Sequence, residues 1–214
     1  MIRTLFVDAG GVLYNNVNEE TDFLDRVADR YGVDRGELAR RVEASAPRYE
    51  SGASHVHRVI ARLVAGGSGP VAGTPAEGRW MDRAYLDSVR PHPDSFRVLR
   101  ELRERWPDVR LVLTNNEAEH WDRLKDEAYG HFALFDTLCS SWRTGRVKPA
   151  PSFFREALRA CRATAAETLL VDDRTTVLRV GTGLGMRTLH VSVPEVFADR
   201  LGPAVRGDAL PSEP

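Results

Sequence analysis

Helical patterns and short apolar runs alternate from residue 90 onward, and this alternation constrains the fold more than any other feature of the sequence. The helices that it predicts span residues 95–106, 121–129, 151–161 and 176–184. The strands between them span residues 109–114, 135–139, 169–171 and 188–191. Strands joined by helices form right-handed βαβ units with a parallel sheet covered on both faces. The sequence therefore predicts an α/β fold with a three-layer core.

A second region, residues 15–87, shows helical spacing of apolar residues without intervening strands. Its predicted helices span residues 22–28, 37–42, 56–63 and 80–86, and a loop rich in glycine and proline at 66–75 divides them. We therefore expect an α-helical insert at 15–87, with hinges at 15–18 and 87–93. Residues 1–14 and 88–214 then form the core. Residues 202–214, rich in proline, glycine and acids, are expected to be a flexible tail.

The composition is typical of a soluble enzyme. The chain has 214 residues, 42% hydrophobic and 29% charged, which is enough to bury a sizeable core. A net charge of -1 gives no reason to expect nucleic acid or an anionic membrane as partner. Without an apolar run of membrane-spanning length or a signal-like start, a cytoplasmic location is expected. Cys139 and Cys161 lack metal-site spacing and are expected to be buried thiols.

Polar side chains follow three of the predicted strands and one loop. Asp8 follows the apolar run 5–7 and precedes two glycines, and Thr114 and Asn115 follow the next strand. Asp172 and Asp173 follow a later strand, and Lys148 precedes Pro149, which is expected to open a helix. Ligands of open α/β sheets bind outside the carboxyl ends of the strands. A single aspartate at the end of a strand is often a helix N-cap, and a Thr-Asn pair there often forms a turn. The four polar features together indicate one functional site.

This ordered set resembles the four motifs of the haloacid dehalogenase superfamily, whose members are mostly magnesium-dependent phosphatases. The resemblance covers residues 2–13 and 91–191, and the helical insert fits the family's first-type cap. One branch of the superfamily looks most similar in three motifs, which are Asp-Ala-Gly-Gly-Val-Leu at 8–13, Gly-Arg-Val-Lys-Pro at 145–149 and Val-Asp-Asp at 171–173. That branch contains sugar-phosphate phosphatases and the N-terminal domain of soluble epoxide hydrolases. The fold implied is a Rossmann-like core with an inserted cap.

The resemblance implies a phosphatase acting on a small phosphorylated metabolite, as a monomer or a homodimer. Asp8 would attack phosphorus and form an aspartyl phosphate that water cleaves. Mg²⁺, a hard cation, would bind Asp8, the main-chain carbonyl of Gly10 and the acidic pair. Asp173 is the better candidate for direct contact, and Asp172 would be a direct or an outer ligand. Phosphoryl oxygens would be bound by Lys148, which also offsets the charge of Asp8, and by Thr114 and Asn115.

One departure from the family pattern concerns the general acid. Most phosphatases of this superfamily carry a second aspartate two residues after the nucleophile, whereas this chain has Gly10. Three explanations follow, in order of preference. The leaving group of the substrate needs little protonation, the cap supplies another acid, or the protein is no longer a hydrolase. Tyr14, His55 and His57 are candidate acids. Two residues apart on a helix do not share a face, so at most one histidine is expected to face a site, and exposure is expected for both. Packing is expected for Tyr14.

The insert is expected to govern specificity as a lid over the strand ends. A polar break between two of its helices is predicted at Arg48, Tyr49, Glu50 and residues 51–54. This break meets the organic part of the substrate, or it is a plain surface turn.

Three alternative functions remain open. A non-catalytic phosphate-binding protein is compatible with Gly10. A haloacid dehalogenase would have no use for the acidic pair, and a phosphomutase would require the acid that Gly10 replaces.

Overall fold

The computed structural model of the chain describes residues 1–207 and contains a five-stranded, all-parallel sheet. The strands are β1 Thr4–Val7, β2 Arg110–Leu113, β3 Thr137–Leu138, β4 Thr168–Asp172 and β5 Arg187–His190, in the order β3-β2-β1-β4-β5. The chain leaves central β1 to build β2 and β3 on one side, then β4 and β5 on the other. The topological switch point, where ligands bind in such sheets, therefore lies at the carboxyl end of β1.

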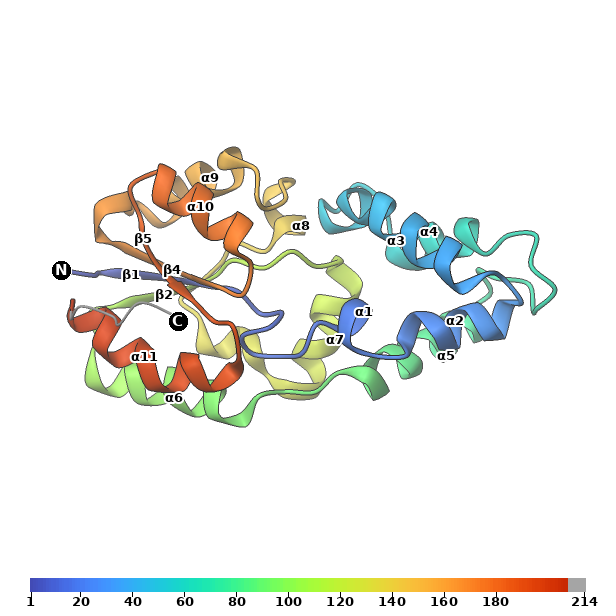
Figure 1. The fold of residues 1–214 in the computed structure, drawn as a ribbon, viewed down its shortest axis with the longest axis horizontal. Coiled ribbons are helices and arrows are strands. Elements are labelled where there is room, and N and C mark those ends of the chain that lie inside the picture. Colours follow the sequence, from blue (N-terminus) through green and yellow to red (C-terminus); the bar gives the residue numbers. More distant parts are fainter. Residues whose placement is uncertain (208–214) are drawn as a thin grey trace.

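Helices cover both faces of the sheet, as the alternating pattern predicts (Figure 1). The core helices are α6 Pro93–Arg105, α7 Glu119–Tyr129, α8 Ser141–Thr144, α9 Pro151–Cys161, α10 Thr175–Gly183 and α11 Pro194–Arg206, with 3₁₀ turns η1 His131–Leu134 and η2 Ala165–Glu167. Phe6 packs with Phe153 on the α9 and α10 face, whereas Leu5 packs in the opposite cluster with Phe197 of α11. Successive strand residues point to opposite faces, and this alternation produces the three layers.

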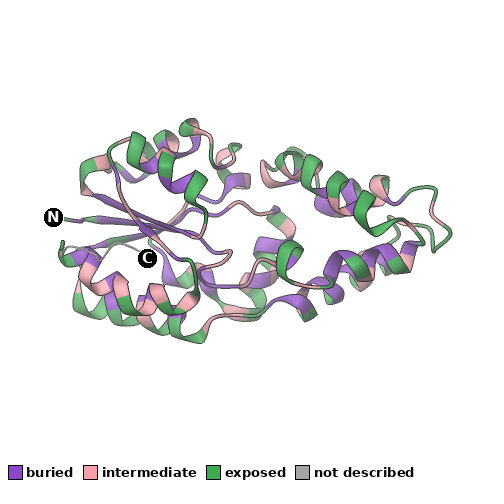
Figure 2. Ribbon diagram, viewed as in Figure 1, coloured by how far each residue is buried: buried purple, intermediate pink, exposed green. Residues whose placement is uncertain are grey.

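The insert contains only helices in the described chain. These are α1 Val17–Glu20, α2 Phe23–Tyr31, α3 Arg35–Glu50, α4 Val56–Leu63 and α5 Pro75–Ser88. Figure 1 shows α2 to α5 beyond the carboxyl ends of the strands, away from the sheet. Their buried faces are turned toward one another in Figure 2, and their outer faces are exposed. The division at residues 14/15 and 87/88 stays a prediction.

Two boundaries within the helices differ from the sequence expectation. Residues 48–50 form the last turn of α3 instead of a polar break, since the helix continues past Pro47 and buries Tyr49. Helix α11 extends to Arg206, so residues 202–206 are helical because Ala204 and Val205 pack into the core. Of the expected flexible tail, residues 208–214 lie outside the described part.

Two expectations about the site loops are also corrected. Pro149 does not open α9, because Pro151 occupies the first turn of that helix after Ala150. The alternative interpretation of the acidic pair, as the N-cap of the helix that follows β4, is also wrong, because Arg174 takes the N-cap position of α10. The predicted strand at 135–139 is reduced to the two residues of β3, which pair only with Val112 and Leu113 at the sheet edge.

Cys139 and Cys161 are free and buried, as predicted. Within residues 1–207, no helix has the length and apolar character needed to cross a membrane.

Candidate active site

A buried lysine joins two carboxylates at the carboxyl end of the central strands. Lys148 Nζ lies 3.0 Å from Asp8 Oδ2 and 2.6 Å from Asp172 Oδ2. The Ala9 backbone N–H donates to Asp8 Oδ1 at 2.7 Å and so fixes the other carboxylate oxygen. The Lys148 backbone N–H donates to Asn116 Oδ1 at 2.8 Å, which positions the lysine loop. Three of the residues predicted from sequence therefore meet at one point.

Asp173 completes a cluster of three carboxylates. An oxygen from each of Asp8, Asp172 and Asp173 lies within 4.8 Å of the others. Asp173 Oδ2 accepts from Asn16 Nδ2 at 2.8 Å, whereas its buried Oδ1 has no hydrogen-bond partner among the described residues. Three carboxylates face Lys148 and, at 4.0 Å from Asp173 Oδ1, the Arg174 guanidinium, so negative charge is in excess. Oxygen donors of this kind suit Mg²⁺. The residues present thus fit the metal that the family resemblance implies.

Burial and charge shift the pKa values of this cluster. Burial, opposed by Lys148 and reinforced by Asp172, raises the pKa of Asp8 to about 6. Burial alone would lower the pKa of Lys148, but the Asp172 and Asp8 carboxylates outweigh it and raise the pKa. Burial and the charge of Asp8 also raise the pKa of Asp173. A bound cation would relieve the repulsion among the carboxylates.

Thr114 and Asn115 are only partly available for a ligand. The Thr114 backbone N–H donates to Val7 O at 2.8 Å, so it is engaged in the sheet. The Thr114 hydroxyl is buried without a partner among residues 1–207. Asn115 Nδ2 donates to the buried Asp122 carboxylate at 2.9 Å, which fixes the orientation of the amide. The hydroxyl of Thr114 is thus the better candidate for phosphate binding.

Asn16 occupies the space that a side chain at position 10 would need. A Cβ atom added to Gly10 would lie 2.5 Å from Asn16 Oδ1, and the same amide donates to Asp173. The sequence placed residue 16 only in a predicted hinge, because Asn16 lies five residues after Gly11 and no local pattern brings its amide to position 10. The Asn16 amide therefore leaves no room for a side chain at position 10.

The structure removes the three candidate acids from this site. Tyr14 is buried, with its ring 5.5 Å from that of Phe96, so packing is confirmed. His55 is exposed as expected, but His57 is half-buried. His55 precedes α4 as its N-cap, and the two rings lie only 5.0 Å apart. The expectation that they point apart is wrong, because only His57 belongs to the helix.

A cavity of about 420 Å³ separates the insert from the strand ends. On the core side it reaches Gly10, Asn16 and Asn115. The insert contributes apolar and polar lining residues, which are Leu24, Ala39, Val42, Ala46, Tyr49 and Tyr85, and Arg40, Glu43 and Glu50. Its size is that of a small-ligand site.

Glu50, in the last turn of α3, lines the cavity and has a pKa close to neutral pH. Burial and the charge of Glu117 raise its pKa to about 7, with a smaller rise from Asp8. Arg174 and Lys148 act in the opposite direction. Glu50 therefore has a pKa near neutral pH and lines the same cavity as Gly10.

Comparison with known proteins agrees with this geometry. A family model described as haloacid dehalogenase-like hydrolase matches residues 2–182. A sesquiterpene phosphatase of Aspergillus oryzae is 31% identical over 110 residues, which are 51% of this chain and 55% of that protein. A glyceraldehyde 3-phosphate phosphatase of Methanopyrus kandleri is 24% identical over 200 residues, covering 89% of this chain and 84% of that protein.

The fold is also shared with solved structures. An enzyme of the same superfamily from Bacteroides thetaiotaomicron, in complex with magnesium and inorganic phosphate, superimposes with a TM-score of 0.73 and 19% identity. The match covers 89% of this chain and 94% of that one.

Proposed function

The chain belongs to the haloacid dehalogenase-like hydrolase family, and we propose that it is a Mg²⁺-dependent phosphatase acting on a small phosphomonoester. The observation that carries the proposal is the contact of Lys148 with both Asp8 and Asp172, beside the Asp173 Oδ1 atom, which accepts no hydrogen bond from residues 1–207. A lysine and a cation together would neutralise a phosphate next to a carboxylate nucleophile. The relatives named as phosphatases support the same choice.

In the proposed mechanism, Asp8, Asp173 and the Gly10 carbonyl would hold Mg²⁺, with Asp172 as a direct or outer ligand, and the ion would supply positive charge for phosphate binding. Lys148 keeps Asp8 ionised and contributes a second positive charge. The Thr114 hydroxyl donates to a phosphoryl oxygen. These groups orient the phosphorus in line with the attacking carboxylate oxygen.

Two chemical steps follow. A carboxylate oxygen of Asp8 bonds to phosphorus as the bond to the organic oxygen breaks, which leaves an aspartyl phosphate. Water then attacks this phosphorus, loses a proton, and releases inorganic phosphate and the free Asp8 carboxylate. Because the alcohol gains a proton in the first step and water loses one in the second, one group can serve both steps.

We assign this proton transfer to Glu50. It faces the cavity that reaches Gly10, and its pKa of about 7 suits both an acid and a base at neutral pH. In the first step it would give its proton to the leaving oxygen, and in the second it would accept one from water. The insert would in this way replace the acid that Gly10 lacks.

The organic part of the substrate would lie against the insert. Leu24, Val42 and Ala46 offer apolar contact, while Arg40 and Glu43 offer polar contact. A sugar phosphate or another small phosphomonoester with some apolar surface fits this mixed wall.

A second candidate, a non-catalytic phosphate-binding protein, is favoured by one observation. Asn16 fills the place of a family acid and is an amide, which does not transfer protons at neutral pH. The acidic pair argues against a dehalogenase, which needs no metal, and the missing acid at Gly10 argues against a phosphomutase.

Phosphate release from a panel of phosphomonoesters tests the proposal. The panel should span sugar, alkyl and prenyl phosphates, with Mg²⁺ or with a chelator, for wild type and Asp8→Asn. We expect release only from wild type with Mg²⁺. Phosphate binding without release from any substrate would favour the non-catalytic alternative.

A further inference from the structure

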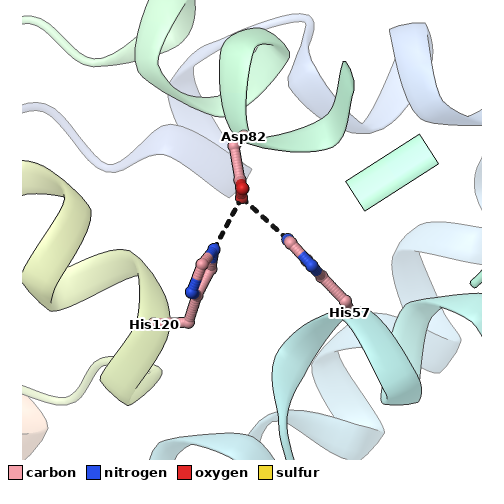
Figure 3. Close-up of side chains that lie close together, drawn as sticks. All are labelled: His57, Asp82 and His120. Atoms are coloured by element: carbon pink, nitrogen blue, oxygen red, sulfur yellow. Dashed lines mark hydrogen bonds and ion pairs between the residues drawn. The ribbon is translucent and has the colours of Figure 1, made fainter. Parts of the chain in front are cut away.

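A second cluster of metal-binding side chains lies away from the carboxylate site, where the insert meets α7. His57 of α4, Asp82 of α5 and His120 of α7 converge there, as Figure 3 shows. His57 Nε2 lies 2.7 Å and His120 Nε2 lies 2.9 Å from the same oxygen, Asp82 Oδ1. These three residues are half-buried, so the cluster is neither a solvated surface patch nor a sealed core.

A third imidazole stands next to the cluster. The ring of His55 lies 5.0 Å from the ring of His57 and 4.9 Å from that of His120. Its Nδ1 accepts from the His57 backbone N–H at 3.2 Å, which leaves Nε2 as the atom for another partner. Half of the six histidines in the sequence thus gather around one carboxylate.

The local structure holds these side chains close together. A Cβ atom at Gly78 of α5 would lie 3.2 Å from His57 Nδ1, so the absence of a side chain there lets α4 and α5 approach. A cavity of about 320 Å³ is lined by His55, Asp82 and His120, among others, and gives solutes access to the cluster. Despite burial, hydrogen bonds from His120 and His57 keep the pKa of Asp82 below its usual value, so the carboxylate is ionised.

We propose that His57, Asp82 and His120 form a second metal site, for Zn²⁺ or a similar divalent transition metal, with His55 or water as the fourth ligand. Two imidazole nitrogens and a carboxylate are the donors that such ions prefer, whereas Mg²⁺ prefers oxygen alone. Bonds of about 2.1 Å in a tetrahedron place ligand atoms roughly 3.4 Å apart. From 2.7 Å and 2.9 Å, the two nitrogens thus need to move away from Asp82 Oδ1 by only about 0.7 Å and 0.5 Å.

A metal in this site would join the insert to the core. Asp82 and His57 belong to the insert, and His120 belongs to α7, which follows the loop that carries Asn115. Occupancy would therefore stabilise one position of the insert over the strand ends. The site is separate from the proposed phosphatase chemistry, and its test does not depend on activity.

Cobalt binding to the tag-free protein is the test, with saturating Mg²⁺ present to occupy the carboxylate cluster. Co²⁺ in a site of few ligands absorbs visible light, so its spectrum reports nitrogen-containing coordination directly. We expect one equivalent of Co²⁺ to bind to wild type with a visible band, and Zn²⁺ to displace it. His57→Gln and His120→Gln should each weaken binding at least about 100-fold, since loss of an outer partner alone costs 10- to 100-fold.

His92→Gln is the matched control, because His92 is also half-buried but lies outside the cluster. It should keep the wild-type spectrum and affinity. The melting temperature without metal checks the fold of each variant, and His57→Gln, on a short insert helix, serves if His120→Gln does not fold. The proposal is overturned if wild type binds no Co²⁺, or if the folded His57→Gln protein binds it as tightly as wild type.

Discussion

At the scale of single residues, the proposed chemistry depends on where protons are held. Asp8 and Lys148 form the reacting end of the site, and Glu50 faces it from the insert. Glu50 is the residue whose assignment can be separated from metal binding, because it is not among the proposed ligands.

We predict that Glu50→Gln lowers the rate on alkyl phosphates by about 10²–10⁴ and affects aryl phosphates much less, since these leaving groups need little protonation. The pKa of Glu50 is about 7, so the acid is protonated below this pH and loses its proton above it. The wild-type rate on alkyl phosphates should therefore fall as the pH rises past about 7. This limb should disappear in Glu50→Gln.

Glu43→Gln is the control for this experiment, because Glu43 lines the same cavity from the same helix. It should retain the wild-type pH profile. Equal rates for wild type and Glu50→Gln on alkyl phosphates would assign the proton transfer to another group.

A second prediction concerns position 10. Restoring an aspartate as Gly10→Asp should weaken Mg²⁺ binding and fail to raise the rate, because the new side chain displaces Asn16 from Asp173. The double variant Gly10→Asp with Asn16→Ala provides the missing space and should be faster on alkyl phosphates than the single variant. Steady-state rates and Mg²⁺ titrations measure both effects. A single variant faster than wild type would show that Asn16 moves at little cost.

Sequence alone predicted that the candidate residues following strands would lie together, and the structure brings Asp8, Asp172 and Asp173 within 4.8 Å of one another. Asp8, Asp172 and Asp173 were predictable because the apolar runs before them mark parallel strands, whose carboxyl ends meet. Asn16 was not recognised, because its role depends on the empty space at Gly10. The histidine cluster was missed because His57, Asp82 and His120 come from three helices, and no local pattern predicts how these helices dock.

At the scale of helices, a partly buried ion pair joins α2 to α5 within the insert. Arg30 donates to Glu77 through Nε and Nη2, each at 2.6 Å, and the Tyr31 hydroxyl donates to the same carboxylate at 3.0 Å. The guanidinium also lies 4.4 Å from the centre of the Trp80 ring. A bidentate pair with these supports contributes more than an exposed pair.

Glu77→Gln should therefore lower the free energy of unfolding by roughly 1–3 kcal/mol at pH 7. Hydrogen bonds from Arg30 lower the pKa of Glu77 from its ordinary value of 4.5. The ionised carboxylate thus stabilises the fold fully above about pH 4.5, and this contribution is lost as the pH falls through the lowered pKa. Urea unfolding at several pH values would measure the difference.

The control is Asp94→Asn, which removes an exposed pair with Arg97 on α6 and should leave the free energy of unfolding close to that of wild type. A difference between Glu77→Gln and wild type that grows at low pH would contradict this account of the pair.

At the scale of the whole molecule, the insert and the core together enclose the cavity. The Tyr85 ring of α5 stacks on Trp121 of α7, with centroids 4.2 Å apart and an angle of 10°. The Tyr85 hydroxyl donates to Glu117 at 2.9 Å, and Lys125 Nζ lies 2.6 Å from the same carboxylate. These interactions of Tyr85 join α5 of the insert to α7 of the core and so hold the cavity wall over the strand ends.

The alternating pattern was sufficient to predict the layers of the core, since each helix between two parallel strands must cover a face. The position of the insert over the site was not predictable in the same way. It depends on contacts such as Tyr85 with Trp121, which join residues distant in sequence. The end of α3 likewise required the structure, because burial of Tyr49 outweighs the proline before it.

Trapping the covalent intermediate tests the central claim most directly. The protein is quenched during turnover of its best phosphomonoester with Mg²⁺, treated with borohydride to reduce any acyl phosphate, and mapped by peptide mass. We predict conversion of Asp8 to homoserine in wild type, no such product without substrate, and none in Asp8→Asn. Modification of a different carboxylate, or phosphate release by Asp8→Asn at the wild-type rate, would contradict the assignment of Asp8 as the nucleophile.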